Sequence, residues 1–226
     1  MLQMKETMKM QIKSHYLHKR DVKTLDETMN IKEALDFIQQ TGFRCVPVLS
    51  AEEEFLGNIY KTHLYEYLYR DNLDPAAPIT TLLSDKDKAV DEKASFFSVF
   101  FTIRQVPYLT VIDEDKKFKG ILTHGKILDI LENAWAVGHS SYALTLSMEE
   151  YKGSLQDIAA TLSKVTDIRS FITLDSDRTF MRRCVVTLPN ETTEDELEKI
   201  VRHLENNHFR IIHIENEKSM AGEGKQ

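Results

Sequence analysis

The stretch GILTHGKIL, residues 120–128, places a threonine, a histidine and a lysine where a short apolar strand meets an amphipathic segment. His124 could bind a metal ion, Gly125 and Lys126 could hold a phosphate group, or the stretch could be an ordinary strand-to-helix turn. His124 has no partner at the spacing of metal ligands, so we expect no metal site. For Thr123, ligand contact and capping of the following helix both stay open, and the two roles are compatible.

The rest of the sequence lacks the patterns of catalysis and metal binding. No GxSxG, HExxH, Walker-type or GxGxxG motif occurs, and the eight histidines are scattered. His15 and His18 lie three residues apart without a second cluster, which is more typical of exposed residues than of ligands. Cys45 and Cys184 lie in apolar strand-like segments and are interpreted as buried free thiols. We therefore expect a protein that is not an enzyme and holds no metal or cofactor.

Composition limits the class of protein further. The chain has 226 residues, of which 42% are hydrophobic, enough for one large or two small cores. Its longest apolar run, FFSVFFTI at 96–103, is far shorter than the ~20 residues of a membrane-spanning helix. The N-terminal residues lack a secretory signal pattern, so we expect a cytoplasmic protein. The net charge of -7 disfavours a surface that binds DNA or RNA but leaves room for a local basic pocket for a small anion.

An internal repeat organises the first part of the chain. Gly120 follows Gly57 by 63 residues, and at this offset residues 42–64 align without a gap with 105–127. Upstream, residues 24–38 resemble 89–103 at an offset of 65. Each copy predicts a short strand, an amphipathic helix, a hairpin with a charged turn, and a closing helix. Gly42 is expected to end the first of these helices.

This repeat resembles a tandem pair of CBS domains, over roughly residues 11–135. The resemblance implies two copies that pack with approximate two-fold symmetry and leave two clefts for adenine nucleotides. Each cleft of the family draws on the end of the last strand, where a glycine is followed by a hydroxyl residue and then an aspartate. The second copy keeps Gly120 and Thr123 but has Lys126 in place of the aspartate, and in the first copy Tyr60 and His63 replace the hydroxyl residue and the aspartate.

These departures suggest a particular kind of ligand. An aspartate accepts hydrogen bonds from ribose hydroxyls, whereas Lys126 can only donate and suits a phosphate. Tyr60 offers a face for a purine, and His63 can donate to an anion. Cyclic di-AMP has ribose hydroxyls tied up in phosphodiester bonds and would not need the aspartate. The predicted ligand-binding residues are Arg44, Cys45, Tyr60, His63, Pro107, Tyr108, Thr123 and Lys126.

The last third of the chain predicts the order βαββαβ, which is the ferredoxin-like arrangement. Strands are expected at 142–150, 168–174, 182–189 and 210–215, with a turn over 175–180 between the middle two, and helices at 152–165 and 192–207. Two capping boxes are possible at the start of the last helix, Thr192 with Asp195 or Thr193 with Glu196. The junction KGSLQDI resembles an ACT domain, which implies pairing through the sheet and, in many members, amino-acid binding.

Together these features predict an α+β protein with a regulatory architecture. The expected divisions are an N-terminal extension (1–10), CBS domain 1 (11–72), CBS domain 2 (73–137), an ACT-like domain (142–217) and a polar tail (218–226). The chain resembles the cyclic di-AMP-binding CBS/ACT proteins of Firmicutes, which implies a nucleotide sensor, a homodimer and a protein target. An amino-acid or AMP/ATP sensor of the acetoin-utilisation type and a ligand-free interaction adaptor remain alternatives.

Overall fold

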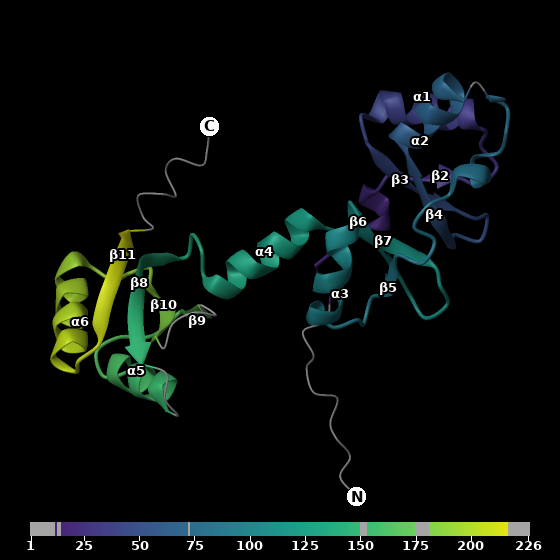
Figure 1. The fold of residues 1–226 in the computed structure, drawn as a ribbon. Helices are drawn as coiled ribbons and strands as arrows, with labels where there is room; N and C mark the ends of the chain where they lie inside the picture. Colours follow the sequence, from purple (N-terminus) through teal and green to yellow (C-terminus); the bar gives the residue numbers. More distant parts are fainter. Residues whose placement is uncertain (1–11, 13–14, 72, 150–152, 175–180, 217–226) are drawn as a thin grey trace, which may run out of the picture. The chain divides into compact units, whose positions relative to one another are not determined.

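The computed structural model describes residues 12, 15–71, 73–149, 153–174 and 181–216 (Figure 1). The predicted extension at 1–10, the turn at 175–180 and the tail at 218–226 lie outside the described residues. The chain forms two compact units, Met1–Leu128 and Asp129–Gln226, each described by itself below. No helix among the described ranges is long and apolar enough to cross a membrane.

The first repeat copy folds in the predicted order. Its elements are β2 (Leu25–Asp26), α1 (Ile31–Thr41), β3 (Cys45–Leu49), β4 (Phe55–Tyr60) and α2 (Lys61–Tyr65), followed by a π-helical turn, η3 (Glu66–Arg70). Asn30 and Glu33 form a capping box at the start of α1, and Gly42 ends it at φ 74°, as predicted. The apolar stripe of α1 packs against β3 and β4, and α1 and α2 lie on the same side of this sheet (Figure 1).

The second copy repeats this order. Its elements are β5 (Ala89–Asp91), α3 (Phe96–Thr102), β6 (Tyr108–Ile112), β7 (Phe118–Thr123) and α4 (His124–Trp135), with a 3-10 turn, η5 (Ile103–Gln105), after α3. In each copy the first strand runs parallel to the second, and the second and third form an antiparallel hairpin. The predicted repeat of the sequence is therefore confirmed as a repeat of structure.

The chain segment before each copy crosses to the sheet of the other copy. Strand β1 (Leu17–His18), followed by the 3-10 turn η2 (Lys19–Asp21), pairs with β7 and gives the sheet order β1-β7-β6-β5. Ser84, which follows the 3-10 turn η4 (Ile79–Leu82), pairs in the same way with Asn58 of β4. These exchanged pairings join the two copies into one unit.

Gly57 and Gly120 make the crossings possible. Both have backbone angles that favour glycine, φ 148° and φ 154°. A Cβ atom at Gly120 would lie 1.9 Å from the carbonyl oxygen of Leu17, and one at Gly57 would lie 2.9 Å from that of Ser84. The glycine shared by the two copies is thus required by the close approach of the crossing segment.

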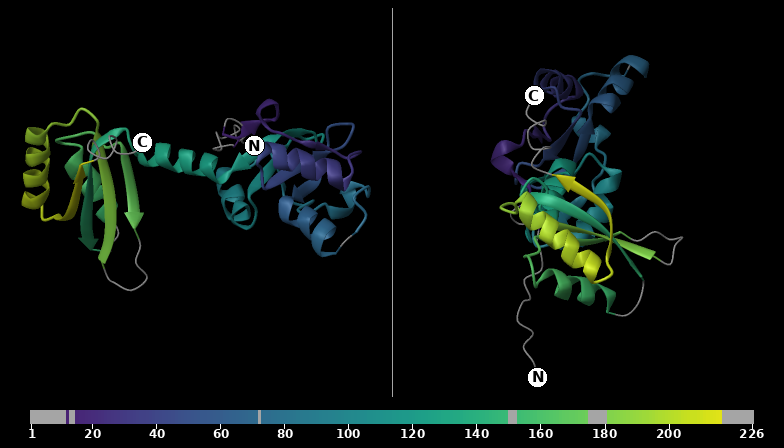
Figure 2. Two further views of the ribbon diagram at one scale, coloured as in Figure 1. Left: turned by 90° about the horizontal axis from the view of Figure 1, so that it is seen from above. Right: turned by 90° about the vertical axis from the view of Figure 1, so that its left-hand side faces the viewer.

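The second unit has the predicted βαββαβ order. Its elements are β8 (Ser140–Glu149), α5 (Ser154–Leu162), β9 (Ser170–Leu174), β10 (Met181–Pro189), α6 (Glu194–Asn206) and β11 (Arg210–Asn216). The antiparallel sheet has the order β11-β8-β10-β9, which confirms the ferredoxin-like arrangement. Helices α5 and α6 cover one face of this sheet, where Ile158 and Ile200 join the apolar core (Figure 2).

Two local predictions for this unit are refined by the structure. Thr193 caps α6 and forms the capping box with Glu196, so the alternative pair of Thr192 and Asp195 is not the one used. Helix α5 ends at Leu162, three residues before the predicted end, because the chain turns through Val165, whose amide bonds to the carbonyl of Leu162.

Candidate functional site

Four of the predicted ligand-binding residues form a row where the two copies of the repeat meet. Cys45 pairs with Tyr60 across the first hairpin, and Tyr108 pairs with Thr123 across the second. The Cys45 thiol lies 3.6 Å from the Tyr108 hydroxyl oxygen and donates to it. The two hairpins are therefore joined at their strand ends, and residues 63 positions apart in sequence come into contact.

Polar contacts hold this strand-end row in place. The Tyr108 hydroxyl donates to Asn58 Oδ1 at 2.7 Å, and the Tyr60 hydroxyl donates to the carboxylate of Asp85. Burial raises the pKa of both tyrosines, and the neighbouring Asp85 adds to the rise. Both phenols are therefore neutral at physiological pH and act as hydrogen-bond donors.

The thiol of Cys45 is an unreactive member of the row. Burial raises the pKa of Cys45 to about 11, which outweighs the opposing effect of its hydrogen bonds to the tyrosines. Because the thiolate is the nucleophile, the thiol has little reactivity near neutral pH. Both cysteines are free thiols as predicted, and Cys184 is buried, but Cys45 is only partly buried because it lies at the open end of its strand.

His63 extends the row by one helical turn in the first copy. Its Nδ1 atom lies 3.4 Å from the hydroxyl of Ser84, and its ring centroid lies 5.1 Å from that of Tyr60. Ser84 and Asp85 both belong to the segment that crosses between the copies. Residues of the crossing segment therefore lie beside the strand ends of the first copy.

The second copy presents a helix N-terminus at the equivalent place. The Thr123 hydroxyl accepts a hydrogen bond from the backbone N–H of Lys126 at 3.3 Å, so Thr123 caps α4. His124 Nδ1 donates to the carbonyl oxygen of Pro107 at 3.1 Å, and its side chain is exposed. The stretch GILTHGKIL therefore forms a capped strand-to-helix turn, with Lys126 in the first turn of α4.

Arg44 and Pro107 complete the predicted set. Both are exposed and directly precede the first residue of a hairpin, and the carbonyl of Arg44 accepts from the backbone N–H of Lys61. All eight predicted residues therefore lie at one end of the two hairpins. Their role as ligand contacts stays a prediction.

Two contributors to this region were missed from the sequence. Asn58 is fully buried within β4, and its Nδ2 atom has no hydrogen-bond partner. An asparagine inside an otherwise apolar strand was a signal, because the equivalent residue of the second copy is Ile121. Nothing in the sequence around Asp85 indicated a role at this site. Its position beside Tyr60 arises only because the segment that contains it crosses to the first hairpin.

Metal binding finds no support in the part of the chain that the structure describes. No group of three or more histidine, cysteine, aspartate or glutamate side chains is arranged there to hold an ion.

The buried bond between Tyr108 and Asn58 yields a stability prediction. Tyr108→Phe leaves Asn58 with neither side-chain group paired, so we expect a loss of about 1 to 3 kcal/mol in unfolding free energy. Replacing both partners, with Asn58→Leu added, should recover most of this loss because no buried polar group is then left unpaired. Urea denaturation of the four proteins of this double-mutant cycle measures the coupling. Additive losses in the double variant would contradict the assignment.

Comparison with known families finds a match in the first copy. Residues 13–70 match the family model described as the CBS domain, a type of module that typically senses nucleotides in regulatory proteins. The match covers the strand, helix and hairpin that contribute Arg44, Cys45, Tyr60 and His63. A search of curated proteins found no match to the chain.

Solved structures support the fold. CbpB in complex with cyclic di-AMP is 24% identical, with a TM-score of 0.50 over 54% of this chain and 84% of that one. A conserved hypothetical protein from Geobacillus kaustophilus is 20% identical, with a TM-score of 0.50 over 55% of this chain and 98% of that one. A CBS domain pair/ACT domain protein from Thermotoga maritima is 24% identical over 54% of this chain and 96% of that one. Its likeness is weaker, with a TM-score of 0.46. At these identities the likeness concerns the fold alone.

Proposed function

We propose that this protein, which contains a CBS domain at residues 13–70, is a non-catalytic sensor that binds cyclic di-AMP at the strand-end row. The observation that carries the proposal is the gathering of the eight predicted residues at one end of the joined hairpins. Together these eight residues combine the neutral phenols of the row, a capped helix N-terminus at Thr123 and the basic residues Arg44 and Lys126. Such a surface suits a ligand with purine rings and phosphodiester groups.

We choose cyclic di-AMP over AMP or ATP because the two family aspartates that bind ribose hydroxyls are missing from this chain. His63 and Lys126 stand where the family has aspartates that accept from ribose hydroxyls. The structure of CbpB, whose fold is similar, contains cyclic di-AMP, which gives the proposal a precedent in that protein.

Calorimetric titration tests the proposed function. Purified full-length protein should bind cyclic di-AMP saturably and more tightly than AMP or ATP, and a panel of amino acids should give no heat of binding. Incubation should leave each nucleotide intact, since no nucleophile and base pair is present at the row. Tighter binding of AMP or ATP, binding of amino acids alone, or turnover that survives repurification would each exclude this function.

The proposal includes an arrangement of domains and partners. CBS domains at 11–72 and 73–137 would bind the ligand, and the ferredoxin-like unit, as an ACT-like domain at 142–217, would pair two chains and pass the signal to a protein target in the cytoplasm. Light scattering checks the pairing. We expect a mass of at least two chains, and a concentration-independent mass of 26.2 kDa would contradict it.

A further inference from the structure

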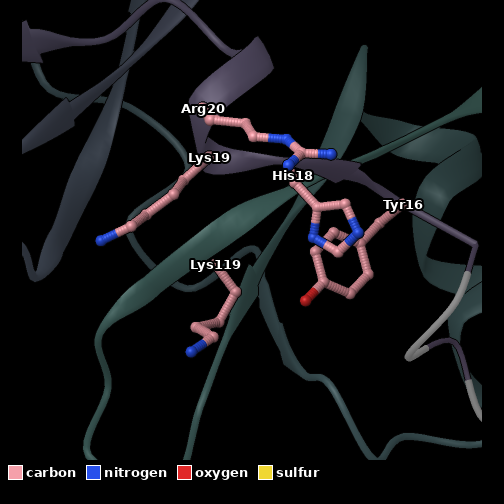
Figure 3. A pocket seen from close by; sticks show the side chains of 5 residues that line it. All are labelled: Tyr16, His18, Lys19, Arg20 and Lys119. Carbon is pink, nitrogen blue, oxygen red and sulfur yellow. The ribbon is translucent and has the colours of Figure 1, made fainter.

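A second polar region of the first unit lies at the other end of strand β7. A pocket with a volume of about 340 Å³ is lined by Tyr16, His18, Lys19, Arg20 and Lys119 (Figure 3). Lys119 comes from β7, and the other four come from β1 and its flanking residues. This volume is within the range of small-molecule sites.

The pocket is separate from the strand-end row. Lys119 and Thr123 lie four residues apart on β7, which corresponds to about 13 Å along an extended strand. Lys119 lies next to the charged turn of the second hairpin, whereas Thr123 starts the closing helix. The eight predicted ligand-binding residues line neither this pocket nor the adjoining one described below.

The basic residues of the pocket stand out against an acidic chain. Four of the five lining side chains are histidine, lysine or arginine, in a protein of net charge -7. Each formal cation has a carboxylate partner near the surface: the exposed Glu53 lies 2.8 Å from Lys19, the exposed Asp21 lies 3.4 Å from Arg20, and the partly buried Asp113 lies 3.6 Å from Lys119. Ion pairs near the surface contribute little net stability, so an anionic ligand can replace the carboxylate at little cost in free energy.

Glu53 shows that lysines of the pocket and its surroundings act on one point. The hydrogen bond from Lys19 lowers the pKa of Glu53, and the charges of Lys117 and Lys119 lower it further. Lys19 and Lys119 extend to the same side in Figure 3. A carboxylate of the protein itself therefore sits where a ligand anion would be attracted.

The pocket also offers an apolar surface. The ring of Tyr16 is buried, and its centroid lies 4.9 Å from that of His18. Lys19 and Arg20 also line an adjoining pocket of about 250 Å³, whose other walls include Leu49 and Phe118. The combination of cations with aromatic and aliphatic walls suits an organic group that carries a phosphate better than a bare ion.

The repeat provides an internal comparison. Ser84 crosses at Asn58 as Leu17 crosses at Ile121, so positions 85–87 of the first crossing correspond to 18–20. The corresponding residues there are Asp85, Lys86 and Asp87, which are mostly acidic. The basic pocket is therefore a property of one edge of the unit and not of the repeated fold.

We propose that the pocket formed by His18, Lys19, Arg20 and Lys119 binds a small phosphorylated organic molecule, at a site distinct from the strand-end row. The amino groups of Lys19 and Lys119 donate to the phosphate oxygens. The exposed guanidinium of Arg20 extends to the opposite side in Figure 3, and it rotates to join them when the ligand binds. Glu53 leaves Lys19 when the phosphate binds. The ring of Tyr16 packs against the organic part of the ligand.

Titration of the full-length protein with phenyl phosphate, in a phosphate-free buffer of low ionic strength, tests the site. We expect saturable binding that is at least tenfold weaker in an Arg20→Gln/Lys119→Gln double variant. Glu53→Gln removes the competing carboxylate and should tighten binding two- to fivefold. Lys86→Gln is the matched control, because this exposed lysine occupies the corresponding position of the other crossing, and it should leave affinity unchanged.

The outcomes separate this site from the proposed function. Saturating cyclic di-AMP should leave phenyl phosphate bound; displacement would place the anion in the strand-end row and overturn the proposal. If Lys86→Gln weakened binding as much as the Arg20→Gln/Lys119→Gln double variant does, the attraction would be non-specific. If inorganic phosphate bound as tightly as phenyl phosphate, the site would not recognise the organic group and the proposal would be wrong. A wild-type protein that binds phenyl phosphate but not cyclic di-AMP would contradict the proposed function alone. Melting temperatures of all variants check that each is folded.

Discussion

Gly120→Ala is expected to destabilise the first unit by about 3 to 5 kcal/mol, because the new side chain meets two obstacles at once. A Cβ atom would lie 1.9 Å from the carbonyl oxygen of Leu17 and 2.9 Å from the ring of Tyr16. The backbone angle φ of 154° is also one that alanine rarely adopts. Relief of the clash requires β1 to move away from β7, which breaks the pairing that joins the two copies.

Gly42→Ala provides the matched control. Its backbone lies in the αL region at φ 74° and ψ 2°, which alanine adopts at a cost of about 1 to 2 kcal/mol, and the added Cβ meets no neighbouring atom within 4 Å, so we expect only that loss. Urea unfolding followed by circular dichroism compares the two variants with the wild type. Any separate transition of the unit Asp129–Gln226 should not shift. Equal losses at the two positions would mean that the close approach at Gly120 carries no energetic weight.

The elements of the fold were predictable because their causes are local. The apolar spacing of residues 31–38 and the glycine at 42 determine α1, and alternating apolar residues around a polar turn determine both hairpins. The exchange of segments between the copies was not predictable in this way, since it depends on pairings between distant residues. The aligned glycines at 57 and 120 indicated that another segment comes close to each strand. Glycine alone does not show which segment that is.

The candidate site was predictable to a similar extent. The repeat placed Tyr60 and Thr123 at equivalent strand ends, and the structure brings both to one edge. The contact of Cys45 with Tyr108 could not be inferred, because the alignment treats them as copies of one position and does not show that the two copies meet there. The basic pocket could not be predicted for another reason. His18 and its neighbours lie far in sequence from Lys119, and the sequence pattern around His18 suggested only a pairing with His15.

Lys126→Asp is expected to weaken the binding of cyclic di-AMP at least 100-fold. Removal of the charged contact alone, as in Lys126→Ala, should cost about 1.5 to 3 kcal/mol where the contact is shielded from water. An aspartate in the first turn of α4 adds repulsion of the phosphodiester groups, and each further 1.4 kcal/mol is another tenfold. Since a carboxylate accepts hydrogen bonds from ribose hydroxyls, the same change should increase the affinity for AMP.

The salt dependence of binding identifies the cause of this loss. The deficit of Lys126→Ala should shrink as ionic strength rises, because screening weakens the contact that the wild type makes. Lys32→Asp, an equal charge reversal at an exposed position of α1, should leave affinity within about twofold, since exposed charges separated by more than about 10 Å are largely screened at 0.1 M salt. Calorimetric titration of these proteins at two salt concentrations measures both effects. If Lys126→Asp binds cyclic di-AMP as well as the wild type, Lys126 does not face the ligand. The inference from the missing aspartate then fails, even though the match of residues 13–70 to the CBS domain model is unaffected.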